Sequence, residues 1–200
     1  LAAGKPLADP DARLLWYVVL ATVPGAVAGK LLDDWAETVF RSPALVALMM
    51  ALMGVVLWLA DRRAGRAAQA GSTVPLRDAL LVGFAQALAI VPGTSRSGAT
   101  ISMALFLGHR RESAARFSFL LALPITLGAA LVKVPELLRS SVDTFPVLAG
   151  MLAAAVSGFL AIRLLLAYVR VRDYRPFVFY RFAFALLVWG LLLVRSAQLG

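Results

Sequence analysis

Three hydroxyl residues and an arginine stand between two apolar runs in the stretch VPGTSRSGAT, residues 91–100. Pro92 ends an incoming helix because it restricts the residue before it, and Gly93 permits a sharp turn. We expect Ser97 to be the N-cap of the next helix, because serine is a preferred residue there. The turn would then present free backbone amides, hydroxyl groups and a guanidinium side by side.

The groups gathered at this turn suit the binding of a phosphate. Helix N-termini bind anions through their amides and dipole, and an arginine binds phosphate oxygens in a bidentate manner. The alternative is that the serine only caps a helix while Arg96 reaches the membrane surface. We favour function, because an unpartnered arginine near the bilayer centre costs about 2.5–3.5 kcal/mol. The candidate catalytic residues are Arg96, Ser95 and Ser97, and the candidate substrate-binding residues are Gly93, Thr94, Thr100 and Gln86.

Three polar residues outside the turn have weaker signals. Gln86, two turns earlier, either hydrogen-bonds another helix or orients a substrate group. Arg181, five residues into the last apolar run, either reaches the lipid headgroups or faces the site, and we favour the headgroups. His109, which precedes two arginines, is predicted to be a solvated loop residue.

The composition places the chain in a membrane. Hydrophobic residues make up 61% of the 200 residues and charged residues 16%, whereas soluble domains are about half apolar and a quarter charged. The net charge of +9 would also suit nucleic acid, but the basic residues cluster in short loops between apolar runs. That clustering is typical of membrane proteins. We therefore predict an all-α, polytopic integral membrane protein that contacts lipids and no nucleic acid.

Several other kinds of site are excluded. The chain has no cysteine and a single histidine, so disulfides, thiolate metal sites and multi-histidine metal centres are ruled out. The phosphate-binding pattern GxxxxGK[ST] is also absent. No metal ligand is predicted within this chain.

Two of the apolar runs are too short to cross a bilayer. The runs are Leu14–Leu32, Pro43–Ala60, Ala79–Pro92, Gly98–Leu107, Phe117–Val134, Pro146–Val169 and Pro176–Val194. The third and fourth have 14 and 10 residues, below the roughly 17–25 that a spanning helix needs. We predict a re-entrant helical hairpin over 79–107, with the polar turn at its tip; the alternative is one long kinked helix that crosses once.

Loop charges separate these two arrangements. Basic residues dominate loops 61–78, 108–116 and 170–175, whereas loop 30–41 carries Asp33, Asp34 and Glu37. A single crossing at 79–107 would place the first two basic loops in opposite compartments. A re-entrant hairpin places all three in the cytoplasm, as the positive-inside rule expects. The hairpin therefore predicts that Arg62, Arg110 and Arg172 face the cytoplasm while Asp34 and Asp143 face outside.

The order of the segments suggests an inverted repeat within a single transmembrane domain, 1–200. Residues 14–60 would be the last two spans of a first repeat. Residues 79–194 would be the second repeat, formed by the hairpin 79–107 and three spans. A first repeat of the same kind needs another hairpin and one more span ahead of Leu1, and we expect this chain to lack them.

Three stretches resemble the bacterial undecaprenyl-diphosphatase family known as UppP or BacA, which is associated with bacitracin resistance. They are GFAQALAIVPGTSRSGATIS (83–102), ARFSFLLALP (115–124) and PFVFYRF (176–182). The resemblance implies two re-entrant hairpins in inverted repeats, in the bacterial inner membrane, with the site open to the periplasm. It implies hydrolysis of undecaprenyl diphosphate to the monophosphate, which recycles the carrier lipid of cell-wall synthesis.

For individual residues, the resemblance implies that Arg96 holds the diphosphate and stabilises charge on the transferred phosphoryl group. Ser95, Ser97 and Thr100 would donate hydrogen bonds or shape the loop. The family's acidic stretch EGxTEF, leading into PxSSTGH, has no counterpart in this chain. Its glutamates imply a divalent cation, Mg or Ca, whose ligands this chain does not contain, and its serine or histidine implies the nucleophile or base.

Two other functions are compatible with these features. One is a membrane transporter or flippase of a lipid-linked or anionic substrate, because midplane hairpins in inverted repeats are common in transporters. The other is a catalytically silent membrane scaffold. The partners expected from the resemblance are a polyprenyl diphosphate lipid and membrane lipids, and self-association into a homo-oligomer is compatible with it.

Overall fold

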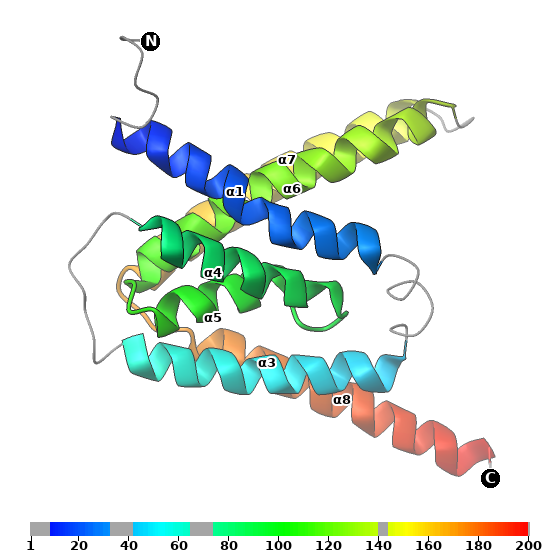
Figure 1. Ribbon diagram of the computed structural model, residues 1–200. Coiled ribbons are helices and arrows are strands. Elements are labelled where there is room, and N and C mark those ends of the chain that lie inside the picture. The colour runs from blue at the N-terminus through cyan, green and yellow to red at the C-terminus, as the bar shows by residue number, and fades with distance from the viewer. Residues whose placement is uncertain (1–8, 33–41, 65–73, 140–143, 200) are drawn as a thin grey trace.

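The computed structural model describes residues 9–32, 42–64, 74–139 and 144–199, which are helical throughout apart from short turns. The helices are α1 (Pro10–Leu31), α3 (Pro43–Ala64), α4 (Leu76–Ala87), the 3₁₀ turn η2 (Leu88–Ile90), α5 (Arg96–Phe106), α6 (Arg111–Arg139), α7 (Thr144–Val169) and α8 (Arg175–Leu199). Figure 1 shows α4 and α5 held between α1 on one side and α3 with α8 on the other.

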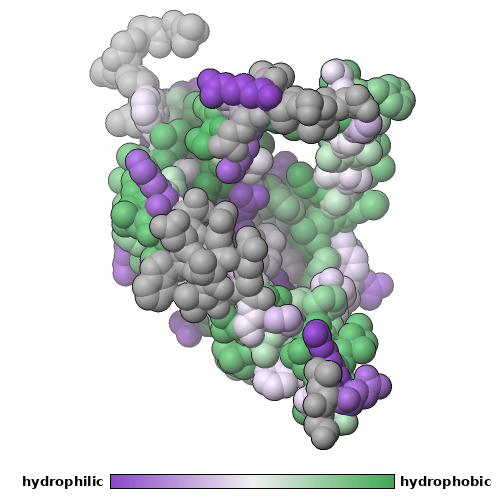
Figure 2. Space-filling model, turned by 90° about the vertical axis from the view of Figure 1, so that its right-hand side faces the viewer, coloured by the Kyte–Doolittle hydropathy of each residue, from purple (hydrophilic) through white to green (hydrophobic). Residues whose placement is uncertain are grey.

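Five of these helices are long and apolar enough to cross a membrane: α1, α3, α6, α7 and α8. They coincide with the five spans predicted from the sequence. In α7, none of the most apolar 18-residue window is buried inside the molecule, and Figure 2 shows apolar side chains over much of the outer surface. A helix that is apolar on every side is stable where lipid surrounds it. The chain is therefore an all-α membrane protein.

The short helices α4 and α5 form a hairpin. Pro92 and Gly93 follow the η2 turn, the chain reverses over residues 91–95, and α5 runs back along α4. The alternative of one kinked helix across 79–107 is wrong, because the backbone turns back at the polar stretch. Entry of the hairpin into the membrane from the cytoplasm, and its place in an inverted repeat, stay predictions.

Close backbone contacts hold the hairpin in place. A Cβ atom at Gly83 of α4 would overlap the backbone carbonyl of Ala21 in α1. At the other side of the hairpin, a Cβ at Gly93 would overlap the carbonyl oxygen of Val46 in α3. Small residues at such points let helices approach each other closely. The tip is therefore seated directly against the main chain of α3.

Ion pairs join the helix ends opposite the tip. The Asp61 carboxylate at the end of α3 lies 2.6 Å from Nε of Arg111 and accepts the backbone N–H of Tyr174 at 3.3 Å. Glu112 pairs with Arg170 at 2.9 Å. These bonds tie the start of α6 to the end of α3 and to the α7–α8 loop. We refer to this region as the basic end.

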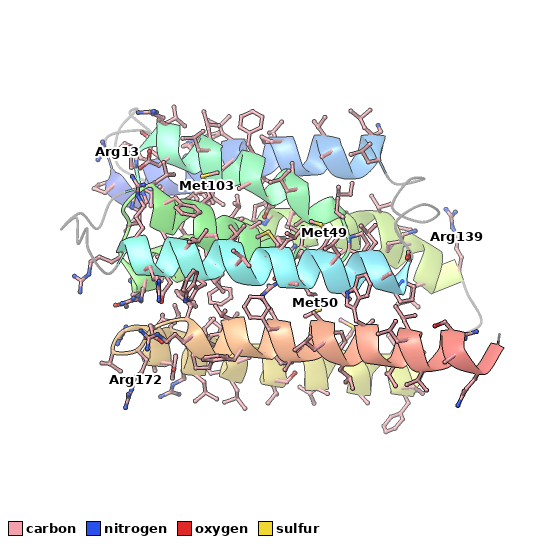
Figure 3. The ribbon with its side chains drawn as sticks, turned by 90° about the horizontal axis from the view of Figure 1, so that it is seen from below. Arg13, Met49, Met50, Met103, Arg139 and Arg172 are labelled. Carbon is pink, nitrogen blue, oxygen red and sulfur yellow. The ribbon has the colours of Figure 1, made fainter. Side chains whose placement is uncertain are left out.

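The described residues of the three basic loops therefore gather at one end of the helices, as a hairpin requires. Figure 3 shows Arg13 and Arg172 there, with Arg139 at the opposite end. Which end faces the cytoplasm stays a prediction. Of the charged loop residues considered above, Asp33, Asp34, Glu37 and Asp143 lie outside the described ranges.

His109 differs from its prediction. It is not a solvated loop residue, because its Nε2 lies 2.8 Å from a carboxylate oxygen of Asp78 and its side chain is only 10% exposed. Asp78 is in the first turn of α4, and His109 follows α5. The pair therefore closes the open end of the hairpin, and this tertiary contact has no signature in the local sequence.

Candidate functional site

The tip of the hairpin is built around an unusual serine. Ser95 has φ of +66°, the one positive value among the non-glycine residues that the structure describes, and it follows Gly93 at +90°. Its hydroxyl accepts the Gly98 N–H at 3.2 Å, so Ser95 is the N-cap of α5. The prediction of Ser97 as N-cap is wrong, because the helix already begins at Arg96.

Ser97 instead lies in the first turn of α5, where it is exposed. Its hydroxyl oxygen is 3.4 Å from that of Ser95. The first amides of a helix have no partner within the helix and point out of its end. Ser95 accepts two backbone N–H groups of this turn. Its hydroxyl accepts that of Gly98, and its carbonyl oxygen accepts that of Ala99. The end of α5 therefore presents two hydroxyls beside the amides of its first residues.

A cavity of about 540 Å³ opens beside this helix end, between the tip, α3 and α8. We call it the tip cavity. Its polar lining comes from the hairpin tip and from α8, and its apolar lining largely from α3 and aromatic side chains of α8. The lining includes Gly93, Ser95, Ser97, Gly98 and Arg181.

Arg181 faces the tip cavity. The residue is 9% exposed, and its buried Nη1 atom has no hydrogen-bond partner among the residues that the structure describes. A Cβ on Gly98 would lie 2.7 Å from Nη2 of Arg181, which places the guanidinium directly beside the start of α5. The interpretation that Arg181 reaches the headgroups is therefore wrong. A buried, unpaired cation beside a helix N-terminus creates strongly positive surroundings that an anion would neutralise.

Arg96 lies on the other flank of the same helix end. Its side chain is exposed, does not line the tip cavity, and donates from Nη1 to the hydroxyl of Thr126 in α6 at 3.3 Å. Two guanidinium groups thus stand on opposite sides of the α5 N-terminus. The serine neighbours of Arg96 predicted its place in the site, whereas the local sequence around Arg181 favoured the lipid headgroups. A charged residue in an otherwise apolar span was the signal available for Arg181.

The remaining predicted site residues do not line the tip cavity. Thr94 and Thr100 are each 1% exposed. The Thr100 hydroxyl is 2.7 Å from that of Ser118 in α6 and donates to the Arg96 carbonyl at 2.9 Å, so it fixes the first turn of α5. The Thr94 hydroxyl is buried without a partner.

Gln86 lies on the face of the hairpin that packs on α1. It is 3% exposed, and both polar atoms of its amide lack a hydrogen-bond partner. A Cβ at Gly25 of α1 would lie 2.9 Å from its Nε2 atom. The predicted alternative of a hydrogen bond to another helix is therefore not observed, and Gln86 does not line the tip cavity.

The residues at the tip do not fit a metal site. They offer hydroxyls, amides and guanidinium groups, whereas Mg²⁺ and Ca²⁺ take carboxylate and carbonyl oxygens. Across the ranges that the structure describes, no three acidic or histidine side chains are close enough to hold an ion. The arrangement instead suits an anionic ligand with several oxygens.

Comparison with known proteins finds similar chains over most of the length of this one. The family model of the bacitracin resistance protein BacA matches residues 2–187. An undecaprenyl-diphosphatase from Moorella thermoacetica is 50% identical over 92% of this chain and 70% of its own length. Enzymes of the same name from Gemmatimonas aurantiaca and Pelotomaculum thermopropionicum are 46% and 44% identical, over 93% and 95% of this chain and 69% and 70% of their own lengths.

Proposed function

The chain belongs to the bacitracin resistance protein BacA family, and from this premise we propose that its hairpin tip binds the diphosphate of undecaprenyl diphosphate. The function is that of an undecaprenyl-diphosphatase, which removes the terminal phosphate and leaves undecaprenyl phosphate. The observation that carries the assignment of the site is the α5 N-terminus with Arg96 on one flank and the buried, unpaired Arg181 on the other.

The chemistry needs charge neutralisation above all. Hydrolysis breaks the bond between the bridging oxygen and the terminal phosphorus, and negative charge develops on the oxygens of both phosphates. Donors that are fixed before the reaction lower its barrier, because they do not have to reorganise. We propose that the two arginines and the first amides of α5 supply those donors, while Ser95 and Thr100 keep the helix end in position.

The lining of the tip cavity fits an amphiphilic substrate. Its polar part is formed by Ser95, Ser97 and Arg181, whereas Met50, Phe177 and other apolar side chains line the rest. We propose that the phosphates lie at the polar part and extend over the end of α5 toward Arg96, and that the first isoprene units of the lipid contact the apolar part. The exposed apolar helices on either side would accommodate the rest of the lipid's isoprenoid chain, which extends into the bilayer.

The orientation follows from the positions of the basic loops. Arginine-rich short loops favour the cytoplasm, and the hairpin tip lies at the opposite end of α4 and α5 from the basic end. We propose that the protein resides in the bacterial inner membrane with the tip accessible from the periplasm. The divalent cation expected from the resemblance has no ligand set among the described side chains, so no step is assigned to it. Loss of activity in EDTA, restored by Mg²⁺ or Ca²⁺, would support a role for the cation.

The test is phosphate release from a polyprenyl diphosphate by purified protein in detergent. One charge-assisted contact to the reacting group is worth about 3–4 kcal/mol, so Arg96→Ala should lower kcat/KM by about two to three orders of magnitude. Arg96→Lys should recover only part of the rate, because lysine lacks the planar fork. Arg139→Ala is the matched control and should keep the rate, because Arg139 is exposed at the end of α6, 13 residues beyond Thr126 and thus roughly 20 Å further along the helix. A wild-type rate for Arg96→Ala would refute the assigned site.

A further inference from the structure

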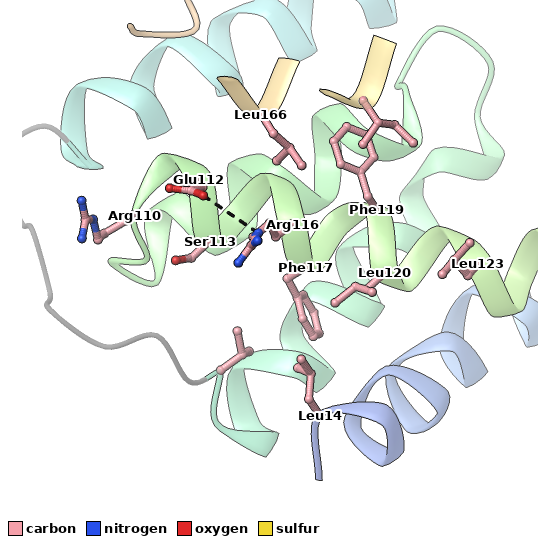
Figure 4. A pocket seen from close by; sticks show the side chains of 12 residues that line it. Leu14, Arg110, Glu112, Ser113, Arg116, Phe117, Phe119, Leu120, Leu123 and Leu166 are labelled. Carbon is pink, nitrogen blue, oxygen red and sulfur yellow. Dashed lines mark ion pairs between the residues drawn. The ribbon is translucent and has the colours of Figure 1, made fainter. Parts of the chain in front are cut away.

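A second hollow, of about 800 Å³, lies along the outer face of α6. We call it the α6 groove. Figure 4 shows Phe117 of α6 pointing toward Leu14 of α1, with Leu166 of α7 on the other side of α6. The groove is separate from the tip cavity, with which it shares no lining residue.

The floor of the α6 groove changes from cationic to apolar along its length. Ser113, Arg116, Leu120 and Leu123 line it and recur every three or four residues, so they share one face of α6. With a rise of about 1.5 Å per residue, Arg116 and Leu123 are separated by roughly 10 Å along the helix. This polarity gradient matches the change from headgroup to acyl chain in a membrane lipid.

The polar mouth of the α6 groove has an excess of positive charge. Arg110 is exposed and makes no ion pair with the side chains that the structure describes. Arg116 is 65% exposed and 3.9 Å from the Glu112 carboxylate, which is already paired with Arg170 at 2.9 Å. The Glu112 carboxylate therefore pairs with both Arg116 and Arg170, while Arg110 has no carboxylate partner among the described side chains. An anion at the mouth would neutralise this excess.

We propose that the α6 groove binds an anionic membrane phospholipid, with its phosphate between Arg110 and Arg116 and an acyl chain along Leu120 and Leu123. Basic pockets between transmembrane helices at the cytoplasmic side bind anionic headgroups, and arginine favours phosphate oxygens. The site goes beyond the phosphatase function, because it lies toward the basic end and uses none of the residues assigned to the substrate.

Such a lipid would also join α7 to the rest of the molecule. The walls of the groove come from α1 and α7, which lie on opposite sides of α6, and α7 packs chiefly on α6. A phospholipid seated between these helices would contact all three. Its binding should therefore raise the melting temperature as well as occupy the groove.

The experiment measures lipid retention by the purified chain with native mass spectrometry. Wild-type protein should retain phosphatidylglycerol in preference to phosphatidylcholine. Each arginine near a charged lipid surface changes binding about fivefold, so Arg116→Gln should lower phosphatidylglycerol retention by about that factor. Arg172→Gln, an exposed arginine at the same end but outside the groove, is the matched control and should leave retention unchanged.

A second variant tests the apolar part without removing charge. Leu120→Trp would fill the groove and should lower phosphatidylglycerol retention while Arg116 is intact. Equal retention of the two phospholipids, or equal loss in Arg116→Gln and Arg172→Gln, would overturn the proposal. Full displacement by glycerol 3-phosphate would show an anion site without a lipid, and preferential binding of a polyprenyl monophosphate would assign the groove to the product lipid; either result would also overturn it.

Discussion

Replacing Gly93 with alanine tests the seating of the hairpin tip on α3. Gly93 has φ of +90°, where an L-residue is strained, by about 1–2 kcal/mol for left-handed conformations. The added Cβ would also overlap the Val46 carbonyl oxygen, and overpacking of this kind costs about 1–3 kcal/mol. Together these effects predict a loss of roughly 2–5 kcal/mol. For a domain of this size, that corresponds to a fall in Tm of roughly 4–20 °C.

Gly93→Ala should also disturb the proposed phosphate site. Backbone carbonyls within a helix move little, so the tip of Gly93→Ala must shift away from α3, and Ser95 moves with it relative to Arg181. We therefore expect phosphate release to fall by more than tenfold in protein that still inserts into the membrane. The assays are thermal unfolding in detergent and phosphate release from a polyprenyl diphosphate at a temperature well below the lowered Tm.

Gly128→Ala is the matched control. Gly128 is an exposed glycine inside α6, and a Cβ there would meet nothing within 4 Å. Alanine at such a position is neutral or stabilises by about 0.5–1 kcal/mol. If Gly93→Ala kept the wild-type Tm and rate, the close contact between the tip and α3 would not exist in the molecule, and the description of the tip cavity would be wrong.

Three further outcomes are expected. Arg181→Lys should reduce phosphate release at least tenfold with little change in insertion, because the buried guanidinium faces the start of α5; a rate equal to that of wild type would remove Arg181 from the site. Burial, together with the nearby Asp61 carboxylate, raises the pKa of Tyr174 above its ordinary value of 10. Its contribution to stability is thus present below pH 10 and lost as the pH rises further, and Tyr174→Phe should weaken the alkaline fall in Tm. Cysteines replacing Arg62 and Arg110 should react with an impermeant thiol reagent from the same side of the membrane, and labelling from opposite sides would contradict the topology.

The spans and the polar turn could be predicted because their signals are local. Runs of apolar residues, a Pro-Gly pair and hydroxyl residues next to Arg96 act through the adjacent backbone or through the lipid. The five spans and the reversal of the chain at residues 91–95 followed directly. Even here the helix start was misplaced by two residues, because Ser95 adopts a positive φ that few non-glycine residues tolerate.

The contacts that complete the site could not be predicted, because they join distant parts of the chain. Arg181 meets Gly98 only after α8 has packed on α3, and no local pattern specifies which face of α8 turns inward. His109 and Asp78 are 31 residues apart in sequence and meet because the hairpin closes. Such contacts are harder to predict for apolar spans, because a helix surrounded by lipid has no polar face that indicates its orientation.

Because α8 forms one wall of the tip cavity, the cavity is complete only after α8 has been synthesised. A ribosome releases α3, α4 and α5 long before α8, and the polar turn at Thr94–Ser97 is unfavourable in lipid until neighbouring helices surround it. Arg181 is synthesised after the hairpin, so a nascent chain has the polar turn but only part of the charge around it. We therefore expect the tip to bind a phosphate only after α8 has been inserted, and a chain truncated after α7 to insert without that binding.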